Sequence, residues 1–326
     1  MDRQAKIYLM QILPLEREAK FYIAGHRGMA GSAIWREAER QGFNQLIGKS
    51  SLDLDLRNRE AVFSFFETEK PVNVVLAAAK VGGILANDSY PADFISENLL
   101  IQVNVMDAAS TFGVERLLFL GSSCIYPKFS RQPISEDALM TGPLETTNEA
   151  YAIAKIAGIK QVQAIRKQHG KSWISAMPTN LYGPGDNYDE KSSHVLPAFI
   201  RRYEKARQQG DQIVINWGTG NPLREFLYVD DLAKAALFLM DNYDGNDHVN
   251  VGVGQDISIR DLSSIISEET EFKGETIWDT SKPDGTPRKL LDVSRINKMG
   301  WTAKTGLREG VRLSLADYRE RYGAKK

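Results

Sequence analysis

Short apolar runs alternate with longer amphipathic stretches from residue 21 onward, and this alternation restricts the possible folds more than any other feature. The apolar runs lie at 21–24, 45–48, 72–76, 117–120 and 173–177. Stretches with apolar residues three and four positions apart lie between them, at 30–41, 59–69, 92–112 and 149–168. Continuous apolar runs are typical of strands buried on both faces, and the longer period is typical of helices. We therefore predict an α/β chain with a doubly wound parallel sheet covered by helices on both sides.

The pattern changes near residue 180, where the segment 180–186 is rich in Gly and Pro and is typical of a loop. We predict a first domain at 20–180 and a smaller α/β lobe at 181–326, with 226–252 returning to the first domain as an edge strand. Helices of the second lobe are expected near 194–208, 230–242, 259–269 and 307–321. Residues 1–19 are predicted to be an N-terminal extension without a signal function, because no cleavage site follows their short apolar run.

Composition excludes several classes of protein. The chain has 326 residues with 41 basic and 42 acidic side chains, so the formal net charge is 41 − 42 = −1. A near-neutral chain lacks the basic face that nucleic acid requires, and no apolar run approaches the roughly 20 residues that cross a bilayer. The single cysteine, Cys124, excludes an intrachain disulfide and a Cys-rich metal site. We predict a soluble cytoplasmic protein with no metal, no nucleic-acid partner and no membrane contact.

A glycine-rich loop follows the first predicted strand and opens the first predicted helix. It comprises Gly25, His26, Arg27, Gly28, Met29, Ala30 and Gly31. Small residues allow the backbone to turn tightly and approach a pyrophosphate, whose charge then lies at the positive end of the helix. An ordinary strand-to-helix turn would also explain three glycines, but the position at the first βα junction favours a Rossmann-type dinucleotide site.

The charges at the end of the second predicted strand favour NADPH as the cofactor. A carboxylate at this place would accept from a ribose 2′-hydroxyl and would repel a 2′-phosphate. Here Lys49, Ser50 and Ser51 follow the strand, and Arg27 lies in the glycine loop. Two alternatives remain open at this point: Lys49 is simply solvated, or the nearby Asp53 selects NADH.

Three residues predict the chemistry. Tyr151 and Lys155 stand four positions apart on one face of a predicted helix, and the strand at 117–120 runs directly towards Ser122. Ligands of open α/β sheets bind at the carboxyl ends of the strands. We therefore predict hydride transfer at a carbon–oxygen centre, in which Tyr151 gives the proton and Ser122 donates to the same oxygen. The charge of Lys155 would favour the phenolate form of Tyr151.

Six motifs resemble the extended short-chain dehydrogenase/reductase family over about residues 21–310. They are AGHRGMAG (24–31), AAAKVGG (77–83), FLGSSCIYP (119–127), YAIAKIAG (151–158), PTNLYGP (178–184) and SKPDGTPRK (281–289). The SSC and KVGG stretches are similar to one branch, which epimerises and reduces GDP-4-keto-6-deoxy-D-mannose with NADPH to give GDP-L-fucose. The resemblance implies this activity, a Rossmann-type fold with a substrate lobe, and a homodimer in which helices 92–112 and 149–168 pair as a four-helix bundle.

The resemblance also implies roles for individual residues. Cys124 and His194 would exchange protons at C3 and C5 of the ketosugar, which are acidic because they adjoin the carbonyl; a thiol and an imidazole both titrate near neutrality. The glycine loop, Lys49, Tyr151 and Lys155 would contact the cofactor. The further cofactor contacts would be Leu120, Gly121, Ser122, Ser123, Pro178, Thr179, Asn180, Leu181 and His194. Purely structural roles remain as alternatives: Cys124 could be a buried packing residue, and His194 a residue at the N-terminus of a helix.

The GDP moiety would be held by the second lobe. The implied contacts are Arg202, Trp217, Arg224 and Lys289, against the alternatives of a solvated helix face for Arg202 and core packing for Trp217. Two departures from the family pattern stand out: the segment 145–151 lacks two prolines, and an acid, Glu275, lies where a cation is common. Two other functions remain as alternatives, namely a redox-neutral NAD-dependent nucleotide-sugar 4-epimerase and a non-catalytic dinucleotide sensor.

Overall fold

A six-stranded sheet forms the centre of the first lobe in the computed structural model, which describes residues 14–190, 192–282 and 284–323. The strand order is β10-β5-β4-β3-β1-β2, and every neighbouring pair is parallel. The bounds are β1 Phe21–Ala24, β2 Leu46–Ile47, β3 Asn73–Leu76, β4 Arg116–Leu120, β5 Ser172–Pro178 and β10 Val249–Val251. The α/β class and the doubly wound parallel sheet predicted from the sequence are confirmed.

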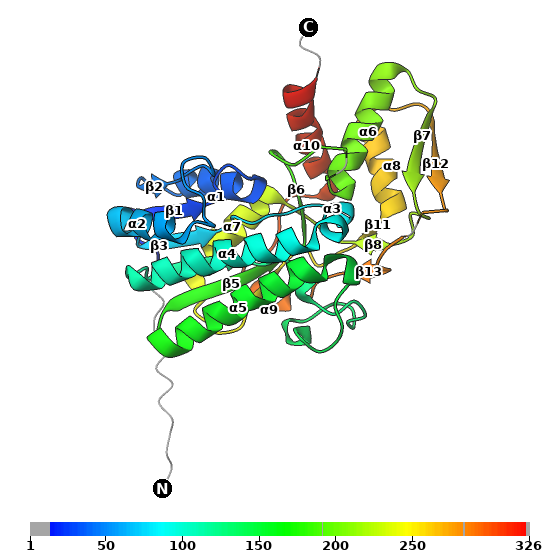
Figure 1. Cartoon of the computed structure of the whole chain (residues 1–326). Coiled ribbons are helices and arrows are strands. Elements are labelled where there is room, and N and C mark those ends of the chain that lie inside the picture. The colour runs from blue at the N-terminus through cyan, green and yellow to red at the C-terminus, as the bar shows by residue number, and fades with distance from the viewer. Residues whose placement is uncertain (1–13, 191, 283, 324–326) are drawn as a thin grey trace.

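Helices cover both faces of this sheet (Figure 1). On one side α1 (Met29–Arg40) packs against α7 (Val229–Asn242), and on the other α4 (Pro91–Thr111) packs against α5 (Glu149–His169) and α2 (Arg59–Glu69).

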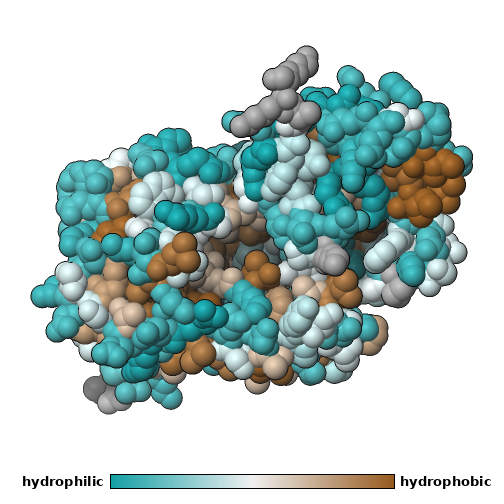
Figure 2. Space-filling view, turned by 45° about the horizontal axis from the view of Figure 1, so that its top comes forward, coloured by the Kyte–Doolittle hydropathy of each residue, from teal (hydrophilic) through white to brown (hydrophobic). Residues whose placement is uncertain are grey.

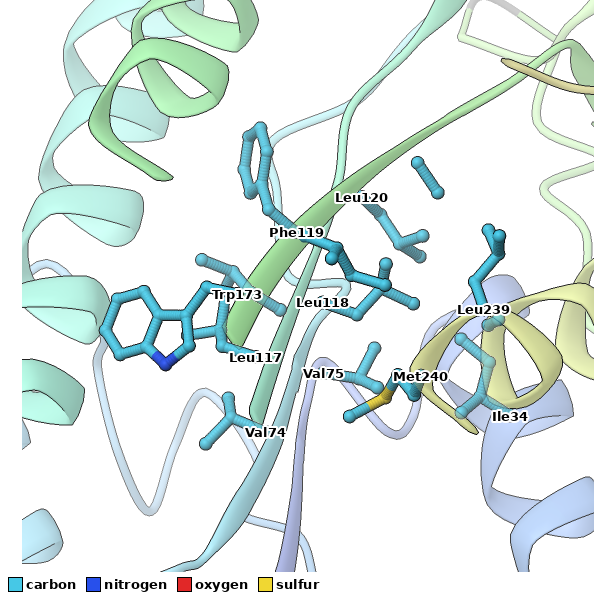
Figure 3. Packing of buried hydrophobic residues seen from close by; sticks show 14 of the residues in the cluster. Ile34, Val74, Val75, Leu117, Leu118, Phe119, Leu120, Trp173, Leu239 and Met240 are labelled. Carbon is cyan, nitrogen blue, oxygen red and sulfur yellow. The ribbon is translucent and has the colours of Figure 1, made fainter. Parts of the chain in front are cut away.

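The strands between the helix layers carry apolar side chains on both faces. In Figure 3, Leu118 and Val75 lie towards Leu239 of α7, whereas Leu117 and Trp173 lie on the opposite side. All five side chains are buried. Burial on both faces is the physical reason that the strands are continuous apolar runs in the sequence.

The second lobe has a hydrophobic core of its own, in which Tyr203, Ile200, Leu262 and Leu315 are buried. Its helices are α6 Val195–Gln209, α8 Ile259–Glu269 and α10 Leu307–Tyr322. Its strands form three small sheets: β7 Ile213–Trp217 with β12 Glu275–Asp279; β6 Asn180–Tyr182 with β9 Phe226–Tyr228; and β8 Leu223–Arg224 between β11 Ile257–Ser258 and β13 Arg288–Lys289. The remaining helices are α3 Ile84–Ser89 and α9 Ser294–Lys298, and the 3₁₀ turns are η1 Ser123–Ile125, η2 Glu136–Ala138 and η3 Thr146–Asn148.

One buried carboxylate joins segments from both lobes. Oε1 of Glu225 accepts from the backbone N–H of Val253 (2.6 Å) and Gly254 (2.7 Å), and Oε2 accepts from Leu291 N–H (3.1 Å). Burial raises the pKa of Glu225, and these backbone donors act against that rise. These contacts fix the position of β13 relative to β8 and to the end of β10, although β13 is distant from β8 in the sequence.

The described part of the N-terminal extension lies against the first lobe. The N–H of Leu15 donates to Asp241 of α7 (2.7 Å), and the Arg17 guanidinium pairs with the same carboxylate (3.0 Å). Residues 1–13 of the predicted extension lie outside the described residues, and the boundary predicted at residue 180 stays a prediction. Among the helices described, none combines the length and the apolar character needed to cross a bilayer.

Candidate active site

The glycine loop lies at the carboxyl end of β1, where the strand order reverses between β1 and β3. Gly25 has φ +86°, and a Cβ there would lie 2.8 Å from Cα of Ala78, which follows β3. A Cβ on Gly31 would collide with the carbonyl oxygen of Gly25. The backbone therefore approaches itself closely around the start of α1, whose N-cap residue is Gly28. Only glycine allows this tight turn, which brings the N-terminus of α1 to the edge of the sheet, where it suits a dinucleotide pyrophosphate.

Two residues of the loop, His26 and Arg27, lie beside the segment that follows β2. The His26 ring packs on Trp35 with centroids 5.4 Å apart, and Arg27 and Lys49 are both exposed. Oδ2 of Asp53 accepts from the hydroxyl of Ser50 at 2.5 Å. That hydrogen bond lowers the pKa of Asp53, and the neighbouring Arg27 and Lys49 lower it further. The Asp53 carboxylate therefore stays charged, but the two cations outnumber it, and this net positive charge suits a 2′-phosphate.

The end of β4 presents Gly121, Ser122 and Ser123 to the same edge of the sheet. Gly121 N–H donates to Ala176 O on β5 (2.9 Å), which continues the sheet by one residue. The Ser122 hydroxyl then accepts from Cys124 N–H (3.4 Å) and starts η1. Because of this turn, Cys124 is buried, with 6% of its surface exposed.

Helix α5 brings Tyr151 and Lys155 to Ser122 and Cys124. Nζ of Lys155 donates to Leu120 O at 2.8 Å and lies 5.7 Å from the centre of the Tyr151 ring. Burial lowers the pKa of Lys155 to about 8. Burial also raises the pKa of Tyr151, the charge of Cys124 adds to the rise, and a hydrogen bond with Ser122 opposes it. The four residues predicted for catalysis on the first lobe therefore form one group.

His194 belongs to the second lobe, where it is the N-cap residue of α6. The carbonyl of Ser192, two residues earlier, accepts from Gly83 N–H at 3.0 Å. The glycine pair Gly82 and Gly83 adjoins Phe94, whose ring meets the Tyr151 ring edge-on at 6.2 Å. His194 keeps exposed surface although the surrounding protein lowers its pKa by desolvation, as expected for a ring on the wall of a cleft. Figure 2 shows the surface hollowed between the two lobes.

The segment from Pro178 to Leu181 leaves β5 at the same edge of the sheet. Thr179 N–H donates to Val251 O (3.0 Å), and Nδ2 of Asn180 donates to Glu225 O (2.8 Å). The backbone is thus held at the end of β5, which is consistent with the predicted cofactor contact.

The predicted GDP contacts form two groups. In the first, Arg202 of α6 donates to Asn216 Oδ1 (2.5 Å) and Ile215 O (3.1 Å) on β7, immediately before Trp217. Trp217 keeps 65% of its surface exposed, so it is not a core residue, and Nζ of Lys282 lies 5.7 Å from its ring centre. Glu275 lies at the other end of β12 from this group, opposite Ile213.

The second group stands on neighbouring strands, where Lys289 of β13 is the register partner of Arg224 of β8. A small cavity has both Cys124 and Lys289 among its lining residues, so this group adjoins the sulfur. Burial lowers the pKa of Arg224 and of Lys289.

Sequence reasoning assigned no role to Glu145 or to Lys128, which lie in this region. Glu145 pairs with Lys128 (3.0 Å) and accepts from the Thr286 hydroxyl (3.1 Å), and both pairs line the Cys124 cavity. Glu145 begins the segment 145–151, which lacks the two prolines of the family pattern. The contacts with Lys128 and Thr286 fix the start of this segment, as the prolines would. The only available signal was the position of Glu145 shortly before Tyr151, which by itself predicts no role.

Comparisons with known proteins place the chain in a family. Residues 21–252 match the model of the NAD dependent epimerase/dehydratase family. GDP-L-fucose synthase 1 of Arabidopsis thaliana is 58% identical over 91% of this chain and 92% of its own length. GDP-L-fucose synthase of Escherichia coli is 48% identical over 90% and 94%. The chain belongs to this epimerase/dehydratase family, in its GDP-L-fucose synthase branch.

Similarity to the branch extends across both lobes. A GDP-L-fucose synthetase of Naegleria fowleri, solved bound to NADP, superposes with a TM-score of 0.89 at 29% identity and covers 97% of each chain. The family model ends at residue 252, whereas these relatives also match the segment that carries Lys289. The branch predicted from the six motifs is therefore confirmed, while the roles of single residues stay predictions.

Proposed function

We propose that the protein converts GDP-4-keto-6-deoxy-D-mannose to GDP-L-fucose in two stages, an epimerisation at C3 and C5 and a reduction at C4. The observation that carries the proposal is the grouping of Ser122, Cys124, Tyr151 and Lys155 at the carboxyl end of β4, next to a dinucleotide cradle. The family membership agrees with this grouping.

The chain offers a complete site for NADPH. The pyrophosphate would lie against the loop from Gly25 to Gly31, where only glycine fits at both ends. Arg27 and Lys49 would hold the 2′-phosphate, because both are exposed and their two charges outweigh the one charge of the nearby Asp53 carboxylate. NADPH, when bound, supplies the hydride for C4.

Epimerisation needs an acid and a base on opposite faces of the sugar. We assign these roles to Cys124, which follows β4, and His194, which begins α6 in the other lobe. One of them takes the proton from carbon as the C–H bond breaks, and the electron pair moves to the carbonyl oxygen. Ser122 and Tyr151 donate to this oxygen, and the second residue then returns a proton to the opposite face.

Reduction uses the same oxygen. When C4 accepts hydride, the carbonyl becomes an alkoxide, which takes the proton of Tyr151 while Ser122 donates a hydrogen bond. The buried Lys155 lies beside Tyr151, and its positive charge stabilises the phenolate that remains. One oxyanion site thus serves both stages.

The decisive experiment follows the near-ultraviolet absorbance of NADPH in the presence of the GDP-ketosugar, together with uptake of solvent deuterium at C3 and C5. Tyr151→Phe is expected to lower NADPH consumption on the order of a hundredfold or more, because it removes the proton donor. Deuterium uptake should fall less, because Ser122 still donates to the enolate oxygen. Tyr322→Phe, on the exposed end of α10, is the control. A 4-epimerase or a dinucleotide sensor would consume no NADPH, and that result would overturn the proposal.

We also propose a homodimer formed through α4 and α5. These helices pack side by side on the outside of the first lobe (Figure 1) and expose Leu100, Val103 and Ile153 on their surface. A second copy of the same face would bury these side chains across a two-fold axis. Sedimentation should give twice the chain mass of 36.5 kDa, and Val103→Asp should give one chain mass.

We also propose that the protein is located in a reducing cytoplasm, which fits its single free thiol.

A further inference from the structure

The cavity beside Cys124 is lined by several charged side chains, although a thiol that stays neutral needs no counter-charge. Its walls come from η1, from the segment after it, and from β13. Three cationic side chains line it, and these are Lys128, Arg288 and Lys289. The environment of each cation decides what it can act upon.

Two of these cations are already paired. Nζ of Lys128 lies 3.0 Å from Glu145, and Nε of Arg288 lies 2.5 Å from Asp256. For Lys289 no carboxylate oxygen of residues 14–190, 192–282 or 284–323 lies within ion-pair distance of Nζ. The charge of Lys289 is therefore available to another group in the cavity.

The strand that carries Lys289 is held on both sides. The next residue, Leu290, donates to Gln132 Oε1 (2.9 Å) and accepts from Ile134 N–H (2.8 Å). Leu291 N–H donates to the buried carboxylate of Glu225. Since the segment 132–134 lies shortly after η1 in the chain, these bonds fix β13 against the loop that carries Cys124.

The sulfur is surrounded by groups of α5, η1 and β13. Burial raises the pKa of the Cys124 thiol, and among the groups that oppose this rise Lys289 has the largest effect, ahead of the Ser122 hydroxyl and of Lys155. The Tyr151 phenol faces the same sulfur, and the charge of Cys124 raises its pKa.

The reciprocal effect acts on Lys289. Burial lowers the pKa of Lys289, and the charge of Cys124 is the largest influence in the opposite direction. Arg224, its register partner on β8, lowers this pKa further, and Glu145 raises it. The ammonium and the sulfur therefore line one cavity and each favours the charged form of the other, with Arg224 and Glu145 as the other charges that act on Lys289.

We propose that Lys289 is the counter-charge of the Cys124 thiolate, so that this lysine serves proton exchange at carbon and acts through the sulfur. The inference rests on the proposed function, because only the epimerisation stage uses the thiolate. In that stage the sulfur lone pair forms the S–H bond while the C–H bond breaks and its electron pair passes to the ketone oxygen. The ammonium of Lys289 stabilises the charged sulfur before this transfer.

The single cysteine of the chain makes a direct test possible. The ultraviolet absorbance of the thiolate is titrated against pH in the full chain without ligands, as the difference between each protein and the same protein carrying Cys124→Ser. Lys289→Met is expected to move the titration midpoint up by about one pH unit or more. Lys289→Arg should keep the wild-type midpoint, and so should Arg288→Met, whose charge is paired with Asp256.

An unchanged midpoint in Lys289→Met would overturn the proposal. If Lys289 bound only the diphosphate, the KM for the GDP-sugar would rise and the midpoint would stay. Lys289→Gln provides a second neutral variant, and retained affinity for NADPH shows that each variant is folded. Because the titration needs no substrate, its outcome is independent of the proposed reaction, whose own failure would appear as absent NADPH consumption in the wild-type protein.

Discussion

The ammonium of Lys155 donates to the carbonyl oxygen of Leu120 at 2.8 Å, which joins α5 to the last residue of β4. This contact holds the lysine one turn from Tyr151 and directly beside the strand end that leads to Ser122. The side chain is buried, with 3% of its surface exposed. Lys155 therefore has a structural role at the strand end in addition to its electrostatic effect on the phenol.

Replacing Lys155 by Met should affect both roles. The Leu120 carbonyl would lose its donor in a buried place, which costs about 1–3 kcal/mol of unfolding free energy. NADPH consumption should fall, because the phenolate of Tyr151 loses the positive charge that stabilises it. Urea unfolding measures the loss of stability. Lys160→Met, on the exposed face of the same helix, is the control, since Nζ of Lys160 donates to the side chain of Gln163 and to no carbonyl of the sheet in the described residues. Equal stability of Lys155→Met and wild type would contradict the structural role.

The pH dependence of reduction should reflect the same lysine. Because burial lowers the pKa of Lys155 to about 8, its positive charge is present below that pH and is lost as the pH rises through it. NADPH consumption should accordingly decline above about pH 8 in the wild-type protein.

Two glycines of the phosphate loop separate folding from binding. A Cβ on Gly31 collides with backbone, so Gly31→Ala should destabilise the fold by roughly 1–3 kcal/mol. A Cβ on Gly28 would meet the Gly25 oxygen at an ordinary 3.4 Å, so Gly28→Ala should fold normally and lose affinity for NADPH. Thermal unfolding and cofactor titration measure the two effects. Gly306→Ala, where a Cβ meets open space, is the control.

The central sheet could be predicted from the sequence because its strands are buried on both faces and separated by helices of clear period. Phe119 and Leu120, for example, lie in a short apolar run between two stretches of helical period, which is the pattern of a buried strand. The same reasoning placed the glycine loop and Ser122 at one edge, since parallel strands share their carboxyl ends.

The pairing of Arg224 with Lys289 could not be predicted in this way. It depends on two-residue strands, β8 and β13, which are too short to have any periodicity and are joined only by tertiary contacts. The carboxylate of Glu225, which holds that region, is a buried acid in a sequence position that no local pattern distinguishes. Family resemblance named Arg224 and Lys289 separately, but it did not place Lys289 beside Cys124.

Asp186 should make stability depend on pH. Its Oδ1 accepts from Asn187 N–H (2.7 Å), its Oδ2 is buried without a partner among the described residues, and burial raises its pKa to about 7. An unfolded Asp titrates near 3.9, so between about pH 4 and pH 7 the native state binds a proton that the unfolded state has lost. Stability should therefore fall as the pH rises through this window, by an amount on the order of 4 kcal/mol.

The variant Asp186→Asn removes the titration. Its unfolding free energy minus that of the wild type, from urea unfolding, should increase from pH 4 to pH 8 and level off above that. Asp211→Asn, at an exposed position after α6, should show a constant difference. Parallel curves for Asp186→Asn and wild type would rule out a raised pKa at this site.

Lys49 should decide between the two nicotinamide cofactors. Its side chain is exposed at the end of β2, near the Asp53 carboxylate, which accepts a hydrogen bond from the Ser50 hydroxyl. Lys49→Glu would place a second carboxylate where we propose that the 2′-phosphate binds, so NADPH should bind at least roughly tenfold more weakly, or about 1.4 kcal/mol. NADH has no 2′-phosphate, and its affinity should change little. Lys205→Glu, an equal change of charge on the exposed face of α6, is the control, and equal losses for both cofactors in Lys49→Glu would show that the 2′-phosphate is held elsewhere.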